Sequence, residues 1–221
     1  MCKHVNSNAK FIVYCKIFIQ KINIVFLALL LSRCASFTLT PSKRLQPQQV
    51  NHYLPWSQRK TQLNAIQNFC VGGHLAAHEN IGHGVNASFR WKQMGDHYQL
   101  NFFGPIPTQS AVLIGNSQHV SLKTVQYTYQ AKNPEQLLQH QLGLSLPVSY
   151  FYYWLRGLPA PQFRYTMNLD AYNRVMQLRQ SGWRIVYRHF THFGDIDLPD
   201  QFDLFNGQWK IRVALNHWDI K

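Results

Sequence analysis

The chain has 221 residues, a length that allows one sizeable hydrophobic core rather than two. It carries 22 basic and 9 acidic side chains, a formal charge of +13. Five of the basic residues precede position 34, so the remainder has 17 against 9, or +8. These charges are dispersed, without a basic run interleaved with stacking aromatics, which argues against a nucleic-acid groove. A basic outer face instead favours an acidic partner or anionic lipid head groups.

The first 33 residues are typical of a targeting segment. Basic residues up to Lys21 precede INIVFLALLLS at 22–32, an apolar run that is short for a membrane span and typical of a signal peptide. Cys34 follows this run and resembles the cysteine of a bacterial lipobox, so we expect it to be lipidated. Arg33 departs from the small residue usual before that cysteine. Residues 34–54 are polar and lack periodicity, as expected of a tether.

The folded part is expected to begin with a helix and to continue as a sheet. WSQRKTQLNAIQNF at 56–69 has the apolar spacing of an amphipathic helix, with Arg59 and Lys60 between the apolar positions. The period then changes from 3.6 to 2, and short connections between alternating segments predict an antiparallel meander. The predicted strands are 69–78, 85–94, 97–103, 109–115, 119–126 and 127–132.

Two short helices and five further strands are predicted next. Asn133 as N-cap, Pro134 and Gly143 delimit the first helix. The second lies within 146–161 and contains a run of five aromatic residues at 150–154, which suits either core packing or a pocket between sheet and helices. The strands are 162–169, 174–180, 183–190, 201–205 and 208–218, with the clearest hairpin turn at 206–207.

These elements predict a mainly β fold of about eleven strands and about three short helices. An antiparallel sheet of that size tends to curl, and the open side of an incompletely closed barrel must be covered. The expected fold is therefore a half-open antiparallel β-barrel, covered by the helices and enclosing a hydrophobic cavity. The predicted domains are a signal peptide at 1–33, a lipidated cysteine with its tether at 34–54, and one folded domain at 55–221.

The connection between the third and fourth predicted strands has an unusual composition. Hairpin tips usually carry Asn, Asp or Gly because they face water, whereas this tip is Gly104-Pro105-Ile106-Pro107. One interpretation is an ordinary turn with a single exposed apolar residue. The other is a stiffened tip that holds Ile106 in water, since each proline fixes φ and lowers the freedom of the loop.

The sequence favours binding over catalysis, without a cofactor or metal. It contains no G-x-S-x-G element and no glycine-rich phosphate loop. His74, His78 and His83 lie close together but lack an H-E-x-x-H pattern. The acidic residues around Pro199 are interpreted as a solvated loop, and their spacing does not fit a calcium loop. Cys70, the one cysteine left after processing, is expected to be a small buried apolar residue.

Several separate segments, in the same order, resemble the LolB family of outer-membrane lipoprotein receptors. The most specific are YWLRGLP at 153–159 and QSGW at 180–183, and the resemblance covers about residue 56 to the end. The other segments are SFRWKQ at 88–93, the Gly104-Pro105 turn, Leu146-Pro147 and Trp218.

The resemblance implies a function and its partners. A member of this family is anchored by lipid in the outer membrane of a Gram-negative bacterium. It takes acylated lipoproteins from the periplasmic carrier LolA and inserts them into that membrane. The expected partners are therefore LolA, client lipoproteins and outer-membrane phospholipid, and the expected state is a monomer without nucleic acid.

The resemblance also implies site residues. The family has a protruding loop with one apolar residue, needed for insertion, and here that residue is Ile106, although Pro107 replaces the usual glycine. The hydrophobic cavity for the acyl chains is expected to be lined by Phe89, Trp91, Leu100, Phe102, Leu155 and Trp183.

Two other functions stay open at this point. A lipid-anchored envelope protein of the same fold could bind another apolar ligand without inserting anything. A lipid hydrolase would need a nucleophile that the sequence does not display.

Overall fold

The computed structural model describes residues 53–82, 84–104 and 110–221. The predicted signal peptide, Cys34 and Pro105, Ile106 and Pro107 of the tip lie outside the described residues. Within them, eleven strands form one antiparallel sheet in the order β6-β5-β4-β3-β2-β1-β11-β10-β9-β8-β7. The edge strands β6 and β7 do not pair with each other, so the sheet is open. This confirms the predicted mainly β, half-open antiparallel fold.

The sheet consists of two meanders that meet at the β1–β11 pair. The first contains β1 (Asn68–Glu79), β2 (Gly84–Met94), β3 (His97–Phe103), β4 (Ala111–Gly115), β5 (Val120–Lys123) and β6 (Thr128–Ala131). The second contains β7 (Tyr165–Leu169), β8 (Val175–Gln180), β9 (Trp183–Phe193), β10 (Ile196–Phe205) and β11 (Trp209–Ile220).

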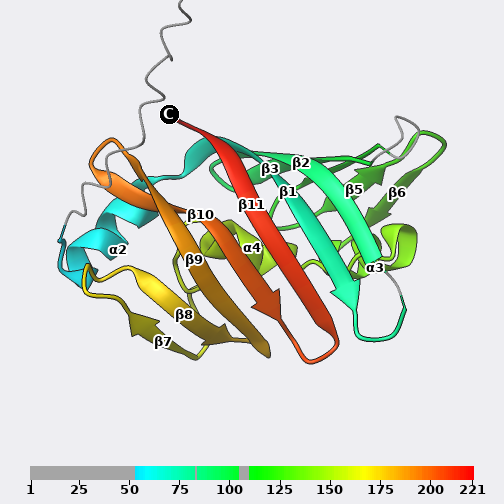
Figure 1. Ribbon diagram of the computed structural model, residues 1–221. Helices are drawn as coiled ribbons and strands as arrows, with labels where there is room; N and C mark the ends of the chain where they lie inside the picture. The colour runs from blue at the N-terminus through cyan, green and yellow to red at the C-terminus, as the bar shows by residue number, and fades with distance from the viewer. Residues whose placement is uncertain (1–52, 83, 105–109) are drawn as a thin grey trace, which may run out of the picture. The chain divides into compact units, whose positions relative to one another are not determined.

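Three described helices accompany the sheet: α2 (Trp56–Ala65), α3 (Pro134–Leu142) and α4 (Val148–Trp154). In Figure 1, α4 lies behind the sheet, with α2 near β8 and β9 and α3 near β5 and β6. The predicted caps of α3 are confirmed: Asn133 Oδ1 accepts a hydrogen bond from Gln136 N at 2.8 Å, and Gly143 closes the helix with φ 62°. None of the described helices is long and apolar enough to cross a membrane.

The hydrophobic core lies between one face of the sheet and the helices. Along β3, for example, Leu100 and Phe102 are buried while their neighbours alternate outward. Among the residues that the structure describes, the buried apolar residues of this core fall between Leu63 and Leu215. We expect this part of the chain to fold without the residues before it.

Two sequence expectations were wrong. The first helix ends at Ala65, short of the predicted apolar positions Ile66 and Phe69, and Arg59 is buried rather than on a polar face. The acidic segment around Pro199 is part of β10, with Asp197 and Asp203 buried. Asp197 is paired with Arg59 of α2, and Asp203 with Arg188 of β9 and Arg212 of β11, so both carboxylates can be buried. A search for apolar alternation misses this strand because of these acidic residues. A third expectation, that Cys70 is buried, was also wrong, because its free thiol is only half-buried.

Candidate functional site

The interior face of the sheet is covered by the aromatic side chains of α4. The Phe151 ring lies at the centre, with ring centroids 6.3 Å from Phe89, 5.9 Å from Trp91 and 5.9 Å from Phe202. Phe151 and Trp154 are fully buried. Both meanders thus contact one short helix, and the aromatic run that suited either core or pocket forms the filling of the interior.

All six residues predicted to line a cavity are buried in this interior. Phe89 and Trp91 on β2 lie directly opposite Phe102 and Leu100 on β3, so four of them form one patch beneath Phe151. The other two lie elsewhere. Leu155 follows the last turn of α4, and Trp183 begins β9, where its ring is 6.4 Å from that of Trp154.

Polar side chains fix the C-terminal end of α4. Gln180 Oε1 accepts hydrogen bonds from Trp154 Nε1 at 3.0 Å and from Ala160 N at 2.8 Å, and its Nε2 donates to Ala160 O at 2.8 Å. The Tyr187 hydroxyl donates to Trp154 O at 2.9 Å, and burial raises the pKa of this hydroxyl above its ordinary value. The end of α4 is therefore tied to β8 and β9 by buried hydrogen bonds.

Arg156 ties the same end of α4 to α2. Its Nη1 donates to Leu63 O at 3.0 Å and to Ile66 O at 2.6 Å, and its guanidinium lies 4.0 Å from the ring centroid of Tyr152. Burial lowers the pKa of Arg156 from its ordinary value. Arg156 thus uses its charge to satisfy the last carbonyls of another helix and to stack on an aromatic face.

These contacts explain the two most specific segments of the family resemblance. Trp154, Arg156 and Gly157 of the first segment and Gln180 and Trp183 of the second meet around the end of α4. Sequence reasoning did not assign roles to Gln180, Arg156 or Tyr187. A polar residue inside an apolar strand or helix was the signal that could have identified them, since buried polar groups need partners.

Two hollows open from the solvent toward this interior. The larger, about 1280 Å³, lies between β7–β9 and the β10–β11 turn and includes Trp183, Trp209 and Phe163 in its lining. The smaller, about 570 Å³, lies between β2–β4 and the end of α3 and includes Phe102 and Leu144. Each hollow has one of the predicted cavity residues in its lining, Trp183 in the larger and Phe102 in the smaller.

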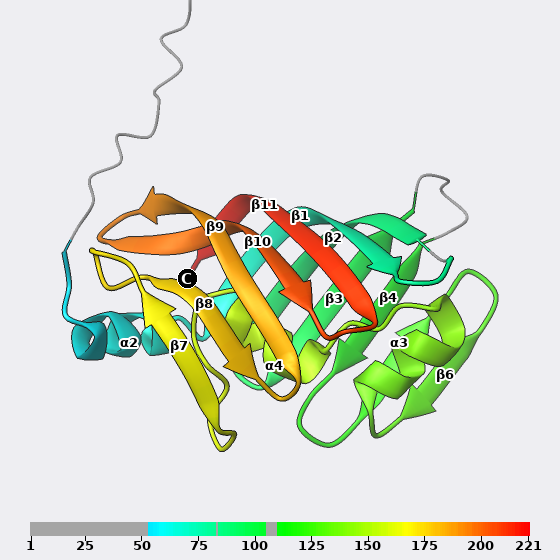
Figure 2. The same ribbon diagram turned by 60° about the horizontal axis from the view of Figure 1, so that its bottom comes forward.

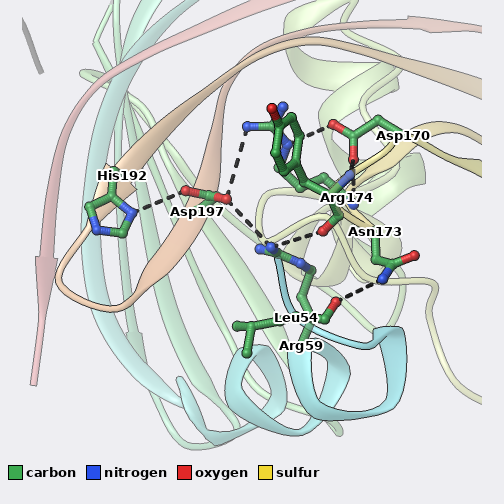
Figure 3. Close-up of polar contacts among 8 residues, drawn as sticks. Leu54, Arg59, Asp170, Asn173, Arg174, His192 and Asp197 are labelled. Carbon is green, nitrogen blue, oxygen red and sulfur yellow. Dashed lines mark hydrogen bonds and ion pairs between the residues drawn. The ribbon is translucent and has the colours of Figure 1, made fainter. Parts of the chain in front are cut away.

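Away from these hollows, a buried ionic network joins α2, β10 and the β7–β8 connection (Figure 3). Asp197 accepts from Arg59 Nη2 at 3.4 Å and lies 3.1 Å from His192 Nδ1 and 3.9 Å from Arg174 Nη1. Arg174 Nε also donates to Asp170 at 2.7 Å. Desolvation lowers the pKa of Arg59, opposed by the charge of Asp197. Because these groups belong to α2, β9, β10 and the β7–β8 connection, the network fixes α2 against the sheet.

Metal binding has no support in the part of the chain that the structure describes, where no group of three or more His, Cys, Asp or Glu side chains is placed to hold an ion. His74 instead lies 3.0 Å from the Ser88 hydroxyl, and His83 lies outside the described residues.

Comparison with known proteins assigns the family. The model of the family described as "Outer membrane lipoprotein LolB" matches residues 67–218. The chain is 35% identical to outer-membrane lipoprotein LolB of Coxiella burnetii over 198 residues, covering 89% of this chain and 91% of that protein. It is 34% identical to outer-membrane lipoprotein LolB of Pseudomonas paraeruginosa over 190 residues, covering 86% and 90%.

A solved LolA superfamily protein from Nitrosomonas europaea superposes with a TM-score of 0.49 at 5% identity, covering 76% of this chain and 94% of that one. At that score the similarity is too weak to establish a shared fold. The match of the family model and the identity to curated relatives are sufficient by themselves, and the chain belongs to the LolB family of outer-membrane lipoproteins.

Proposed function

We propose that this protein accepts acylated lipoproteins from a periplasmic carrier of the LolA type and inserts them into the outer membrane. The observation that carries the proposal, beside family membership, is the apolar interior beneath α4, which an acyl chain could share after a small displacement of one helix. Phe89, Trp91, Leu100, Phe102, Leu155 and Trp183 are proposed to contact the chain there.

The contacts of α4 indicate how it could move. Its C-terminal end is held by the buried hydrogen bonds of Gln180, Tyr187 and Arg156. The Phe151 side chain, one turn earlier, makes only apolar contacts, and the N-terminal turn has one exposed hydrogen bond to α3, from Ser149 N to Glu135 Oε1 at 2.8 Å. Apolar contacts with Phe151 can be replaced by contacts with an acyl chain, but the buried hydrogen bonds cannot. We therefore place the hinge at the C-terminal end, with the N-terminal half of α4 yielding to the ligand.

Transfer needs no energy source if affinities are graded. Each buried methylene contributes about 0.8 kcal/mol, and about 1.4 kcal/mol gives a tenfold preference. If this protein encloses two more methylenes of the acyl chain than the carrier does, the binding equilibrium favours this protein by about tenfold or more.

The remaining parts of the proposal concern residues outside those described. Residues 1–33 are proposed to be removed as a signal peptide, and Cys34 to carry the lipid that anchors the domain at 55–221. Ile106, held by Pro105 and Pro107 after Gly104, is proposed to enter the membrane. Burial of one isoleucine side chain contributes only about 1.5–3 kcal/mol, so Ile106 can perturb the bilayer but cannot replace the lipid anchor.

The test is a transfer assay with residues 35–221, which contain all of the core that the structure describes. This fragment is mixed with a lipoprotein bound to its carrier, and the two proteins are separated by an affinity tag. We expect the lipoprotein to move to the fragment. Retention by an active carrier would refute the acceptor role. Ile106→Glu should preserve acceptance and abolish delivery to membranes, and loss of acceptance would show that the loop acts earlier.

A further inference from the structure

The two ends of the sheet differ in charge. Because the strands are antiparallel, the β1–β2, β5–β6, β8–β9 and β10–β11 connections lie at one end, which we call the turn end, together with the last residue of β3. The β2–β3, β7–β8 and β9–β10 connections lie at the other (Figure 2), which we call the carboxylate end. This end holds the acidic residues Asp96, Asp170, Asp195, Asp197, Asp200 and Asp219. The turn end has Glu79 at the last position of β1, where its Oε1 accepts a hydrogen bond from Gln208 Nε2 at 2.7 Å.

A row of cations crosses four strands at the turn end. Arg179 on β8 lies directly opposite Arg184 on β9, which lies opposite Phe205 on β10, which lies opposite Lys210 on β11. Arg184 stacks on Phe205 with 4.2 Å between guanidinium carbon and ring centroid, and Lys210 Nζ lies 5.9 Å from the same centroid. Arg164 joins these three cations in the lining of the larger hollow.

These four cations lack carboxylate partners. None of them forms an ion pair with any residue that the structure describes. The nearest acid along β10, Asp203, is fully buried and already pairs with Arg188 at 2.6 Å and with Arg212 at 3.2 Å. Like charges directly opposite each other in a sheet are destabilising, so the Arg179–Arg184 pair is unfavourable until an anion lies beside it.

Exposed apolar side chains accompany the cations on two different turns. Ile81 in the β1–β2 connection is 86% exposed, and Val125 and Tyr127 in the β5–β6 connection are 65% and 61% exposed. Apolar exposure alone does not distinguish the ends, since Met94 and Ile114 are also exposed near the carboxylate end. Unpaired cations such as Lys92 and Lys132 also occur near the carboxylate end, but they do not lie opposite other cations on paired strands. The turn end combines apolar tips with a row of cations on paired strands, a combination that suits a bilayer interface.

We propose that the turn end is a membrane-binding surface. The cations Arg164, Arg179, Arg184 and Lys210 contact anionic phospholipid head groups, while Ile81, Val125 and Tyr127 enter the interface. A bilayer accounts for apolar tips on separate turns, whereas an acidic protein partner would account only for the cations. The proposal goes beyond lipoprotein acceptance, which takes place in solution, but rests on the proposed function for its claim that the protein works at a membrane.

The test of the cation row is flotation of residues 35–221 with vesicles of phosphatidylcholine, with and without phosphatidylglycerol. The variant carries Arg179→Gln, Arg184→Gln and Lys210→Gln. Its matched control carries Lys60→Gln, Lys92→Gln and Lys132→Gln, three exposed residues that lose the same charge. We expect binding to the anionic vesicles to fall on the order of 100-fold in the variant and far less in the control. Equal losses in both would overturn a localised surface.

The exposed apolar residues of the turn end are tested by a second variant and a matched control. Ile81→Ser with Val125→Ser should weaken binding to both kinds of vesicle by about tenfold or more, whereas Met94→Ser with Ile114→Ser should leave it unchanged. Unchanged binding in the first pair would overturn the role of the tips. Thermal unfolding of the lysine control and of both apolar variants should match that of the parent fragment, because their substituted side chains are exposed. The cation-row variant should be no less stable than the parent, because it loses the repulsion between Arg179 and Arg184.

The lipoprotein transfer assay separates this proposal from the proposed function. The cation-row variant should still accept lipoprotein from the carrier in solution while losing vesicle binding. If it loses acceptance and keeps vesicle binding, the row is a protein-docking surface and the membrane proposal is wrong. If the parent fragment binds anionic vesicles but accepts no lipoprotein, the proposed function fails and the membrane surface stands.

Discussion

The two ends of the sheet use the same residue types for opposite purposes. At the carboxylate end, Arg59 and Arg174 are buried or nearly so and share Asp197, so the charges hold α2 to the sheet. At the turn end, Arg179 on β8 and Arg184 on β9 lie directly opposite each other, and neither forms an ion pair with a described carboxylate. Charged side chains that are buried and paired thus hold elements of this fold together, whereas charged side chains that are exposed and unpaired are available to bind another molecule.

Removing the central carboxylate of the ionic network at the carboxylate end should have the largest effect on stability. Asp197→Ala removes the carboxylate that faces Arg59, Arg174 and His192, and we expect a loss of about 3–5 kcal/mol in the free energy of unfolding. Urea unfolding measures this loss. The control is Asp219→Ala, an exposed carboxylate of the same end, which should change stability by less than about 0.5 kcal/mol. Similar values for both variants would show that the network contributes nothing.

Loosening α4 should have the next largest effect. Gln180→Leu leaves Trp154 Nε1 and the Ala160 amide without their buried acceptor, at about 1–3 kcal/mol for each unpaired group. Hydrogen exchange should show faster exchange at Ala160 than in the parent. Gln177→Leu, on the opposite face of the same strand, is the control. Unchanged protection of Ala160 would contradict a hinge held by Gln180.

A substitution in the β10–β11 turn should lower the free energy of unfolding by less than the two changes above. Gly207 has φ 85°, and an added Cβ would meet no atom within 4 Å. Gly207→Ala should therefore lose only the backbone cost of a left-handed conformation, about 1–2 kcal/mol, as measured by urea unfolding. A larger loss would mean that the turn contributes packing as well as conformation.

The smallest expected effect has the opposite sign. Arg179→Gln removes one of two like charges that face each other and should raise stability by about 0.2–1 kcal/mol at low ionic strength. Thermal unfolding at low and high salt measures it, and the gain should shrink as salt screens the repulsion. Arg188→Gln, which loses a partner of buried Asp203, should destabilise instead. Destabilisation by Arg179→Gln would mean that the row is already neutralised within the protein.

The sequence predicted the regular parts of the fold because their signals are local. Alternation located the strands, and Asn133 with Gly143 marked both ends of α3. Arg59 and the acidic part of β10 were misread because their partners lie more than 100 positions away in one case and on neighbouring strands in the other. Single-residue polarity cannot reveal such pairing.

The candidate site was predicted unevenly for the same reason. The six cavity residues were identified as inward-facing from alternation and the family resemblance, and all are buried. That α4 fills the space beneath them could not be predicted, because a dense aromatic run suits both a pocket and its filling. The cation row also escaped notice, since Arg179, Arg184 and Lys210 become neighbours only through strand pairing.

The orientation of the anchored protein on a bilayer tests the distinction between the two ends most directly. The processed chain, which begins at lipidated Cys34 and carries Cys70→Ala, is given one free thiol by Val125→Cys or, as the matched position, by Met94→Cys, and each is labelled with an environment-sensitive fluorophore. On phosphatidylglycerol-containing vesicles, the account predicts a blue-shifted, lipid-quenchable label at position 125 and a water-exposed label at position 94. A water-exposed label at 125, or a buried label at 94, would contradict it.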